Sequence, residues 1–139
     1  PTMGGGLAYS TPDSPPTHDF DIWRDTSLQK LVWFNLPIDL VEGEPMTPFV
    51  RAAGVADVGN PLTNWGTEGL QYVNSDVTML LARLPESTAI GLAARDRQSA
   101  DGVSVGAATM YDRRGPIGTC TVTALASEVQ MRQPQRDLR

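Results

Sequence analysis

The stretch "TPFVRAAGVADVGNP", Thr47 to Pro61, predicts one short helix and decides the fold around it. Thr47 can cap free backbone amides, and Pro48 suits the first helical position because its missing N–H costs nothing there. Apolar residues then recur at helical spacing, namely Phe49, Ala52, Ala53 and Ala56. Gly, Asn and Pro at positions 59–61 favour a stop. Small residues on most sides indicate a helix that a sheet could enclose.

The rest of the chain reads as strands arranged around this helix. Residues 28–36, "LQKLVWFNL", are β-rich and mostly apolar on both faces, as in a covered strand. Further strand-like runs follow the helix at residues 70–84, 88–95, 102–112 and 116–127. The separators "PES", "DRQSAD" and "RRG" are short enough for antiparallel hairpins. We therefore expect a strand, a helix and then a four-stranded meander.

The two ends of the chain differ in composition from its middle. Residues 1–27 are rich in Gly, Pro and polar residues, which is typical of a linker, although Ile22 and Trp23 could pin its later part to a folded body. Residues 128–139 read as a polar tail, which leaves residues 28–127 as the predicted domain. Because the sequence starts with Pro1, we expect a longer natural polypeptide with another domain upstream.

Composition excludes several classes of function. The formal net charge of -5 and the scattered basic residues argue against nucleic-acid binding. No apolar run approaches the roughly 20 residues of a membrane span. The single cysteine, Cys120, excludes an intrachain disulfide and reads as a buried small hydrophobe. With His18 as the sole histidine, in a Pro-rich stretch, we expect no metal site, no cofactor and no Ser-His-Asp machinery.

Three segments, "PFVRAAGVADVGNP", "LQYVNSDVTMLLARLP" and "GVSVGAATMYDRRGPIGTCTVTAL", carry a family resemblance. In this order and spacing they resemble the C-terminal hotdog of the acyl-CoA thioesterase II-like proteins, which contain two hotdogs in tandem. The resemblance implies an α+β hotdog fold, in which a curved antiparallel sheet of about five strands wraps one central helix. It further implies acyl-CoA or another acyl thioester as substrate, a second hotdog domain as partner and a cytoplasmic location.

The resemblance also implies where a hydrolytic water would be held. In the family these positions are an Asp near the end of the buried helix, a hydroxyl residue two before an Asp in the next strand, and a Gln in the last strand. Carried over residue by residue, they fall on Asp57, on Asn74 ahead of Asp76, and on Val122. This sequence thus keeps the first position, alters the second and lacks the third.

Hydrolysis of a thioester needs a group that orients or deprotonates water and donors for the developing oxyanion. Asp57 could do the first with help from Asn74, and backbone amides near the start of the helix, at residues 48–50, could do the second. The alternative for Asp57 is a solvent-facing carboxylate in a loop. By the period of two, Asn74 and Asp76 should share one strand face, which could equally be solvated or part of an interface.

Val122 is the main argument against an active enzyme, because an apolar side chain can neither orient water nor donate a hydrogen bond. Two hypotheses therefore remain open. One is a thioester hydrolase in which Val122 replaces the expected Gln. The other is a non-catalytic structural or acyl-binding hotdog that assembles with a second hotdog. A hotdog dehydratase would normally use a histidine, and His18 is poorly placed for that role.

The resemblance places the acyl pocket at the junction with a second hotdog. Phe49, Trp65, Tyr72 and Val122 are the candidates for binding the substrate there. The strand at residues 70–84 should be an edge strand, and an unpaired edge of that length is a liability. We therefore expect this edge to pair with a second hotdog, either an N-terminal half of a longer polypeptide or a second copy of the chain.

Overall fold

The structure is a computed structural model that describes residues 6–24, 29–35 and 39–127, so the predicted C-terminal tail lies outside the described residues. Its main sheet contains six antiparallel strands in the order β1-β2-β6-β7-β8-β5. These strands are β1 (Gly6–Ser10), β2 (Leu31–Asn35), β5 (Tyr72–Leu81), β6 (Ile90–Ala100), β7 (Val103–Asp112) and β8 (Gly115–Ala126). The remaining elements are the helices η1 (Phe20–Arg24), α1 (Pro48–Ala56) and α2 (Gly59–Asn64) and the small pair β3 (Trp65–Gly66) and β4 (Gly69–Leu70).

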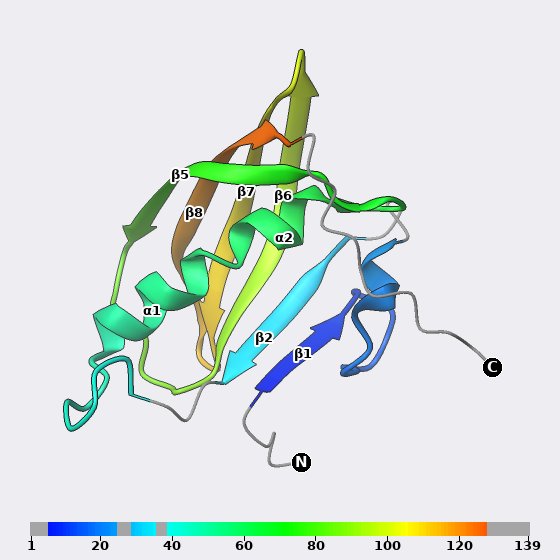
Figure 1. Cartoon of the computed structure of the whole chain (residues 1–139). Helices are drawn as coiled ribbons and strands as arrows, with labels where there is room; N and C mark the ends of the chain where they lie inside the picture. Colours follow the sequence, from blue (N-terminus) through cyan, green and yellow to red (C-terminus); the bar gives the residue numbers. More distant parts are fainter. Residues whose placement is uncertain (1–5, 25–28, 36–38, 128–139) are drawn as a thin grey trace.

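The main sheet curves around α2, which contacts β5, β6, β7 and β8 (Figure 1). Leu62 of α2 is fully buried against the apolar side chains that these strands and β2 turn inward, among them Val32, Ile90, Leu92 and Met110. Removal of this apolar surface from water is the main favourable term in folding. The predicted fold class, an antiparallel sheet wrapped around a central helix, is therefore confirmed, with six strands in place of about five.

The helix begins where the sequence predicts but does not end there. The Thr47 hydroxyl accepts a hydrogen bond from the Val50 N–H at 3.2 Å, and Pro48 occupies the first turn. After a turn at Asp57 and Val58, however, the chain continues into α2 instead of stopping at Gly59. Gly59 serves close packing instead, because a Cβ there would lie 2.9 Å from Val122 Cγ2.

The predicted four-stranded meander is wrong in one connection. Strands β6, β7 and β8 follow one another through tight turns, but β5 pairs with β8 and not with β6. The segment between β5 and β6 therefore crosses the end of the β7–β8 hairpin, where Ala82 N–H donates to Ile117 O at 2.9 Å. The sequence prediction failed because a short separator is compatible with a hairpin but does not require one.

A buried carboxylate holds this crossing segment in place. The Asp112 side chain is fully buried and accepts two hydrogen bonds from the Arg83 guanidinium, both at 2.7 Å. It also accepts from the backbone N–H groups of Glu86 and Arg114, each at 2.9 Å. These hydrogen bonds, the one from Arg83 above all, hold the Asp112 pKa well below its usual range despite burial. One side chain therefore ties the β5–β6 connection to the β7–β8 turn.

The interpretation of residues 1–27 as linker is wrong for residues 6–10, which form β1. This strand pairs with β2 from Gly6 opposite Asn35 to Ser10 opposite Leu31 and covers what would otherwise be an open sheet edge. Trp23 of η1 is buried and packs edge-on against Tyr9, with ring centroids 4.9 Å apart. Because Gly and Pro are typical of linkers, the composition of this segment did not indicate the strand of five residues.

A β-bulge in β5 changes which side chains face the helix. The register with β8 shifts between Asn74 and Asp76, so Ser75 is the extra residue. Asn74 lies opposite buried Ala124, whereas Asp76 lies opposite Thr123. The expectation that Asn74 and Asp76 share one face is therefore wrong, because the bulge interrupts the period of two.

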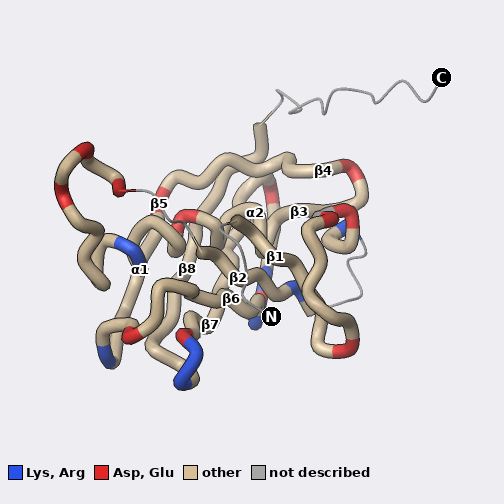
Figure 2. The backbone as a smooth tube through the Cα atoms, turned by 90° about the horizontal axis from the view of Figure 1, so that it is seen from below, with Lys and Arg blue, Asp and Glu red and all other residues tan. Residues whose placement is uncertain are grey.

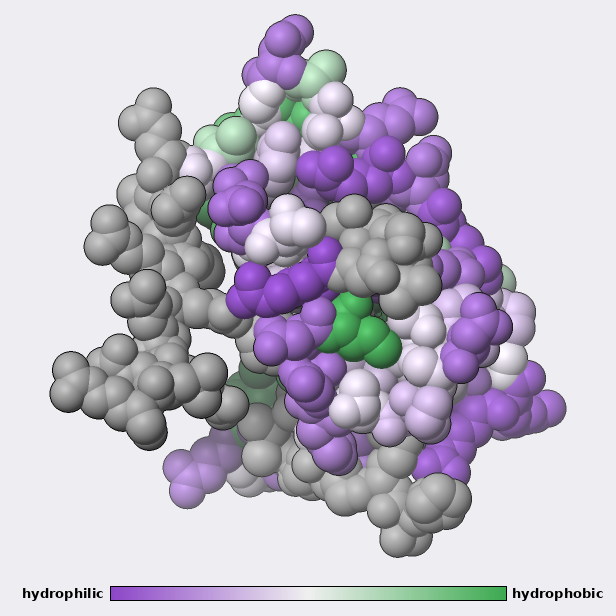
Figure 3. All heavy atoms as spheres, turned by 90° about the vertical axis from the view of Figure 1, so that its right-hand side faces the viewer, coloured by the Kyte–Doolittle hydropathy of each residue, from purple (hydrophilic) through white to green (hydrophobic). Residues whose placement is uncertain are grey.

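Most charged residues of the described ranges lie at the surface, and Lys30 and Asp112 are buried exceptions. In the part of the chain that the structure describes, basic positions are scattered among acidic ones and do not join into a stripe (Figure 2). The side of the molecule shown in Figure 3 is covered mainly by polar side chains, with apolar ones confined to small areas. No helix in the described ranges is long and apolar enough to cross a membrane.

We expect Gly106→Ala to destabilise the fold by about 1–3 kcal/mol, the usual cost of overpacking a core. A Cβ at Gly106 of β7 would lie 2.5 Å from Thr63 Cβ and 2.2 Å from Thr63 Oγ1, so α2 would have to move away from the sheet. Urea denaturation measures the change. Gly54→Ala, at an exposed position of α1, is the control, since nothing lies within 4 Å of a Cβ there. A stability of Gly106→Ala equal to the wild type would contradict the close contact of α2 with β7.

Candidate functional site

Asp57 and Asn74 come together at the edge of the sheet. Asp57 is the C-cap of α1, and Asn74 lies on the helix-facing side of β5 because of the bulge at Ser75. Asn74 Nδ2 donates a hydrogen bond to Asp57 Oδ1 at 3.0 Å. In the described part of the chain, neither Asp57 Oδ2 nor Asn74 Oδ1 has a hydrogen-bond partner, so both oxygens are available to a water molecule.

A small pocket of about 240 Å³ lies beside this pair. It is lined by Asp57, Val58, Asn60, Pro61, Leu70, Tyr72, Val73 and Asn74. Asn60 is buried, donates from Nδ2 to Tyr72 O at 3.2 Å and accepts from Asn64 at 2.7 Å, so its amide fixes the start of α2 against β5. The walls are thus held in place, while Asp57 and Asn74 remain exposed to solvent.

Val122 lies in the core close to this region and is shielded from solvent. It is 1% exposed, and its Cγ2 faces Gly59 at the start of α2. Its neighbours across the sheet are Val77 on β5 and Gly106 on β7. Cys120 lies on the same face, and burial raises the pKa of its thiol to about 11, so it is inert as a nucleophile. No hydrogen-bonding side chain replaces the expected Gln at position 122.

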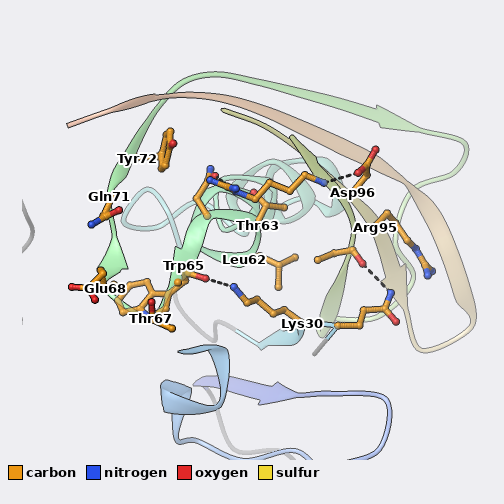
Figure 4. A pocket seen from close by; sticks show the side chains of 16 residues that line it. Lys30, Leu62, Thr63, Trp65, Thr67, Glu68, Gln71, Tyr72, Arg95 and Asp96 are labelled. Atoms are coloured by element: carbon orange, nitrogen blue, oxygen red, sulfur yellow. Dashed lines mark hydrogen bonds between the residues drawn. The ribbon is translucent and has the colours of Figure 1, made fainter. Parts of the chain in front are cut away.

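A larger pocket of about 650 Å³ lies on the other side of Tyr72, around the C-terminal end of α2 (Figure 4). Trp65 and Tyr72, both predicted as pocket lining, contribute to its wall. Phe49 does not line either pocket; its side chain is 55% exposed on α1. Of the four predicted substrate-binding residues, the structure therefore brings Trp65 and Tyr72 together and leaves Phe49 and buried Val122 outside both pockets.

A polar network forms the wall of the larger pocket on the side of the sheet. Asn64 Oδ1 accepts from Ser104 Oγ at 2.6 Å and from Arg97 Nε at 2.8 Å. The Arg97 guanidinium lies over the ring of Tyr72, 5.1 Å from its centroid. Lys30, at the start of β2, is 7% exposed and donates from Nζ to the carbonyl of Trp65.

Lys30 and Arg97 were not predicted as site residues. The signal for Lys30 was present, because a lysine shares the inward strand face with Val32 and Phe34 in "LQKLVWFNL". Burial, followed by the nearby Arg97, lowers the pKa of Lys30 to about 8. No comparable signal existed for Arg97, whose orientation depends on a bulge in β6.

The backbone amides at the start of α1 are poorly placed to serve Asp57. Helical rise puts the N–H groups of Phe49 and Val50 about 10–12 Å from the C-cap, and the Val50 N–H already donates to Thr47. The second N–H of the Asn74 amide is a donor beside Asp57 that remains available, since the first is used by Asp57. Within the described ranges, no three His, Cys, Asp or Glu side chains are grouped to hold a metal ion.

Comparison with known proteins agrees with the observed fold. The family model described as "Acyl-CoA thioesterase C-terminal domain" matches residues 1–126, which is most of the chain. The chain belongs to this family. The search of curated proteins gave no match.

A solved structure supports the fold of this member of the acyl-CoA thioesterase C-terminal domain family. A proposed thioesterase from Syntrophus aciditrophicus SB superimposes with a TM-score of 0.57 at 7% identity. The match covers 87% of this chain and 84% of that chain. At this identity the likeness establishes the hotdog-like fold and does not transfer an activity.

Proposed function

We propose that this domain hydrolyses acyl-CoA thioesters in the cytoplasm, with Asp57 and Asn74 holding the attacking water. The observation that carries the proposal is the 3.0 Å hydrogen bond between Asn74 Nδ2 and Asp57 Oδ1 beside a pocket. Membership of a thioesterase domain family supports the substrate class. The two side chains come from a helix end and an edge strand that are 17 positions apart in the sequence.

In the proposed reaction, Asp57 Oδ2 accepts a proton from the water as its oxygen attacks the thioester carbonyl carbon. The carbonyl oxygen becomes an oxyanion, and the second Asn74 N–H donates to it. The tetrahedral intermediate then collapses, the C–S bond breaks, and the departing thiolate takes the proton from Asp57. The products are a carboxylic acid and free CoA, and Asp57 is again a carboxylate.

We further propose that a second hotdog covers the β5 edge when the site is complete. One side of β5 has no neighbouring strand in the described sheet, and Val73 and Leu80 on it are 50% and 66% exposed. An unpaired strand of this length is suited to pairing with another strand. The exposed position of Asp57 supports the same proposal, because burial by a partner would exclude bulk water from the reaction.

The test is release of CoA from a panel of acyl-CoA chain lengths, followed with a thiol reagent. Cys120 is buried, so the signal in the folded protein comes from released CoA. We expect turnover with at least one chain length. Acyl-CoA binding without turnover at any length would instead favour a non-catalytic acyl-binding hotdog, the function that the dry environment of Val122 supports. If the protein neither binds nor hydrolyses any acyl-CoA of the panel, both functions are refuted.

A further inference from the structure

Lys30 and Arg97 are two of the three basic residues that line the larger pocket; the third, Arg95, is held by Thr109 and Tyr111. Lys30 Nζ uses one of its three protons, in the hydrogen bond to Trp65 O. Arg97 uses Nε on Asn64 at 2.8 Å and Nη1 on Ser99 at 3.2 Å, whereas Nη2 has no hydrogen-bond partner in the described part of the chain. Neither side chain forms an ion pair with a described residue. Donors on both cations therefore remain available.

A β-bulge directs Arg97 toward the helix. The register of β6 with β7 shifts between Ala94 and Asp96, so Arg95 is the extra residue. Arg97 consequently lies opposite Gly106, on the face that packs against Thr63 of α2. Without the bulge, regular alternation from Leu92 would put Asp96 on this face instead. Bulges of this kind re-aim side chains and are common beside binding sites.

The bulge gives opposite orientations to two neighbouring arginines. The Arg95 guanidinium points away from the pocket (Figure 4) and is held by Thr109 Oγ1, 2.9 Å from Nε, and by the Tyr111 hydroxyl. The Arg97 guanidinium stacks on Tyr72, whose ring lines both pockets. Arg95 and Arg97 therefore carry the same charge on the same strand but point to opposite faces of it.

Lys30 and Arg97 repel each other electrostatically. Arg97 is exposed to solvent, yet it contributes to lowering the pKa of Lys30 to about 8, after the larger effect of burial. Within the described ranges, neither acidic residue of the pocket wall, Glu68 or Asp96, forms an ion pair with these two cations. Glu68 is exposed, and the Asp96 carboxylate accepts from the backbone N–H of Arg97 at 2.8 Å. A bound anion would compensate both cations and use their remaining donors.

We propose that the larger pocket binds an organic anion, whose carboxylate or phosphate group lies between the Lys30 ammonium and the Arg97 guanidinium. The pocket volume of about 650 Å³ exceeds the needs of the anionic group alone and leaves room for an attached chain against Trp65 and Leu62. This binding site is separate from Asp57 and does not depend on hydrolysis.

The test is an NMR titration of the protein with three probes: glutarate, inorganic phosphate and the neutral glutaramide. We expect glutarate or phosphate to shift the resonances of Lys30, Trp65 and Arg97, and glutaramide to leave them unchanged. The tighter of the two anions identifies which group the pocket prefers. Failure of both anions to bind the wild type, or equal binding of glutaramide, would overturn the proposal.

Variants separate a specific site from general attraction of anions. Lys30→Met and Arg97→Gln should each weaken anion binding at least about tenfold, the scale of a lost hydrogen bond to a charged group. Arg95→Gln removes the same charge from the same strand on the opposite face and should leave the affinity unchanged. If Arg95→Gln weakens binding as much as Arg97→Gln, the specific site is refuted. Should Lys30→Met fail to fold, the comparison of the two arginine variants decides the question.

Discussion

Asp112→Ala is expected to lower the free energy of unfolding by about 3–5 kcal/mol, the cost of breaking a buried ion pair by removing one partner. The Asp112 side chain is fully buried and accepts four hydrogen bonds, two from Arg83 and one each from the amides of Glu86 and Arg114. Alanine would leave the Arg83 guanidinium without its bidentate partner and two amides without acceptors. Urea denaturation followed by circular dichroism measures the change.

A second ion pair in the same turn provides the matched control. Arg114 and Glu86 also form a salt bridge, but their side chains are 69% and 53% exposed. Exposed pairs contribute about 0–1 kcal/mol, so Glu86→Gln should be nearly neutral. If Glu86→Gln and Asp112→Ala cost the same, Asp112 does not hold the β5–β6 connection as the structure indicates.

The depressed pKa of Asp112 also sets a pH dependence. Because the carboxyl has a lower pKa in the folded state than the ordinary 3.8, its contribution to stability is fully present above that value. As the pH falls below about 4, the unfolded state takes up the proton first and this contribution is lost. The Asp112→Ala variant lacks this carboxylate and its contribution to stability. The difference in free energy of unfolding between the wild type and the variant should therefore shrink as the pH is lowered.

Asp57→Asn is expected to reduce kcat/KM for an acyl-CoA substrate at least about 100-fold, the lower range of general-base effects. The amide is nearly isosteric with the carboxylate but cannot accept a proton from water at neutral pH. Since Asp57 is exposed, stability should change by no more than about 0.5 kcal/mol. Activity and thermal unfolding are measured on the same preparation, so a loss of rate is not confused with a loss of fold.

Asp76→Asn is the control for this prediction. Asp76 is two positions from Asn74, but the bulge at Ser75 puts it on the opposite face of β5. The same change of charge there should leave the rate unaltered. If Asp57→Asn retains full activity, or if Asp76→Asn loses as much, Asp57 is not the general base.

The sequence predicts the fold well where its signals are local. The Thr-Pro start of the helix and the small residues that enclose it were readable because caps and helical spacing act over a few positions. The strands from residue 70 onward were also found, but β6 continues to Ala100, so most of the predicted separator at residues 96–101 is strand. What could not be read was which strand β5 pairs with, because that pairing depends on Asp112 and Arg83, which are 29 positions apart.

The candidate site was predictable in its residue types and not in their orientation. Asp57 and Asn74 were both singled out, and the structure brings them into hydrogen-bond contact. Asn74 and Asp76 lie on opposite faces of β5 because of one extra residue in that strand. Arg95 and Arg97 lie on opposite faces of β6 for the same reason. A bulge has no distinctive sequence signature, so the period of two assigned Asn74 and Asp76 incorrectly, and Arg97 fell in a predicted separator between strands.

The pairing of β5 with β8 has a consequence for folding kinetics. Strands β6, β7 and β8 are joined by turns of two residues, so their hairpins close short loops. Asn74 on β5, by contrast, lies opposite Ala124, fifty positions away (124 − 74). Loop-closure entropy and contact order are therefore larger for the strand that carries Asn74 than for the hairpins it joins. The geometry of the candidate site thus depends on a long-range contact that local propensity alone cannot form.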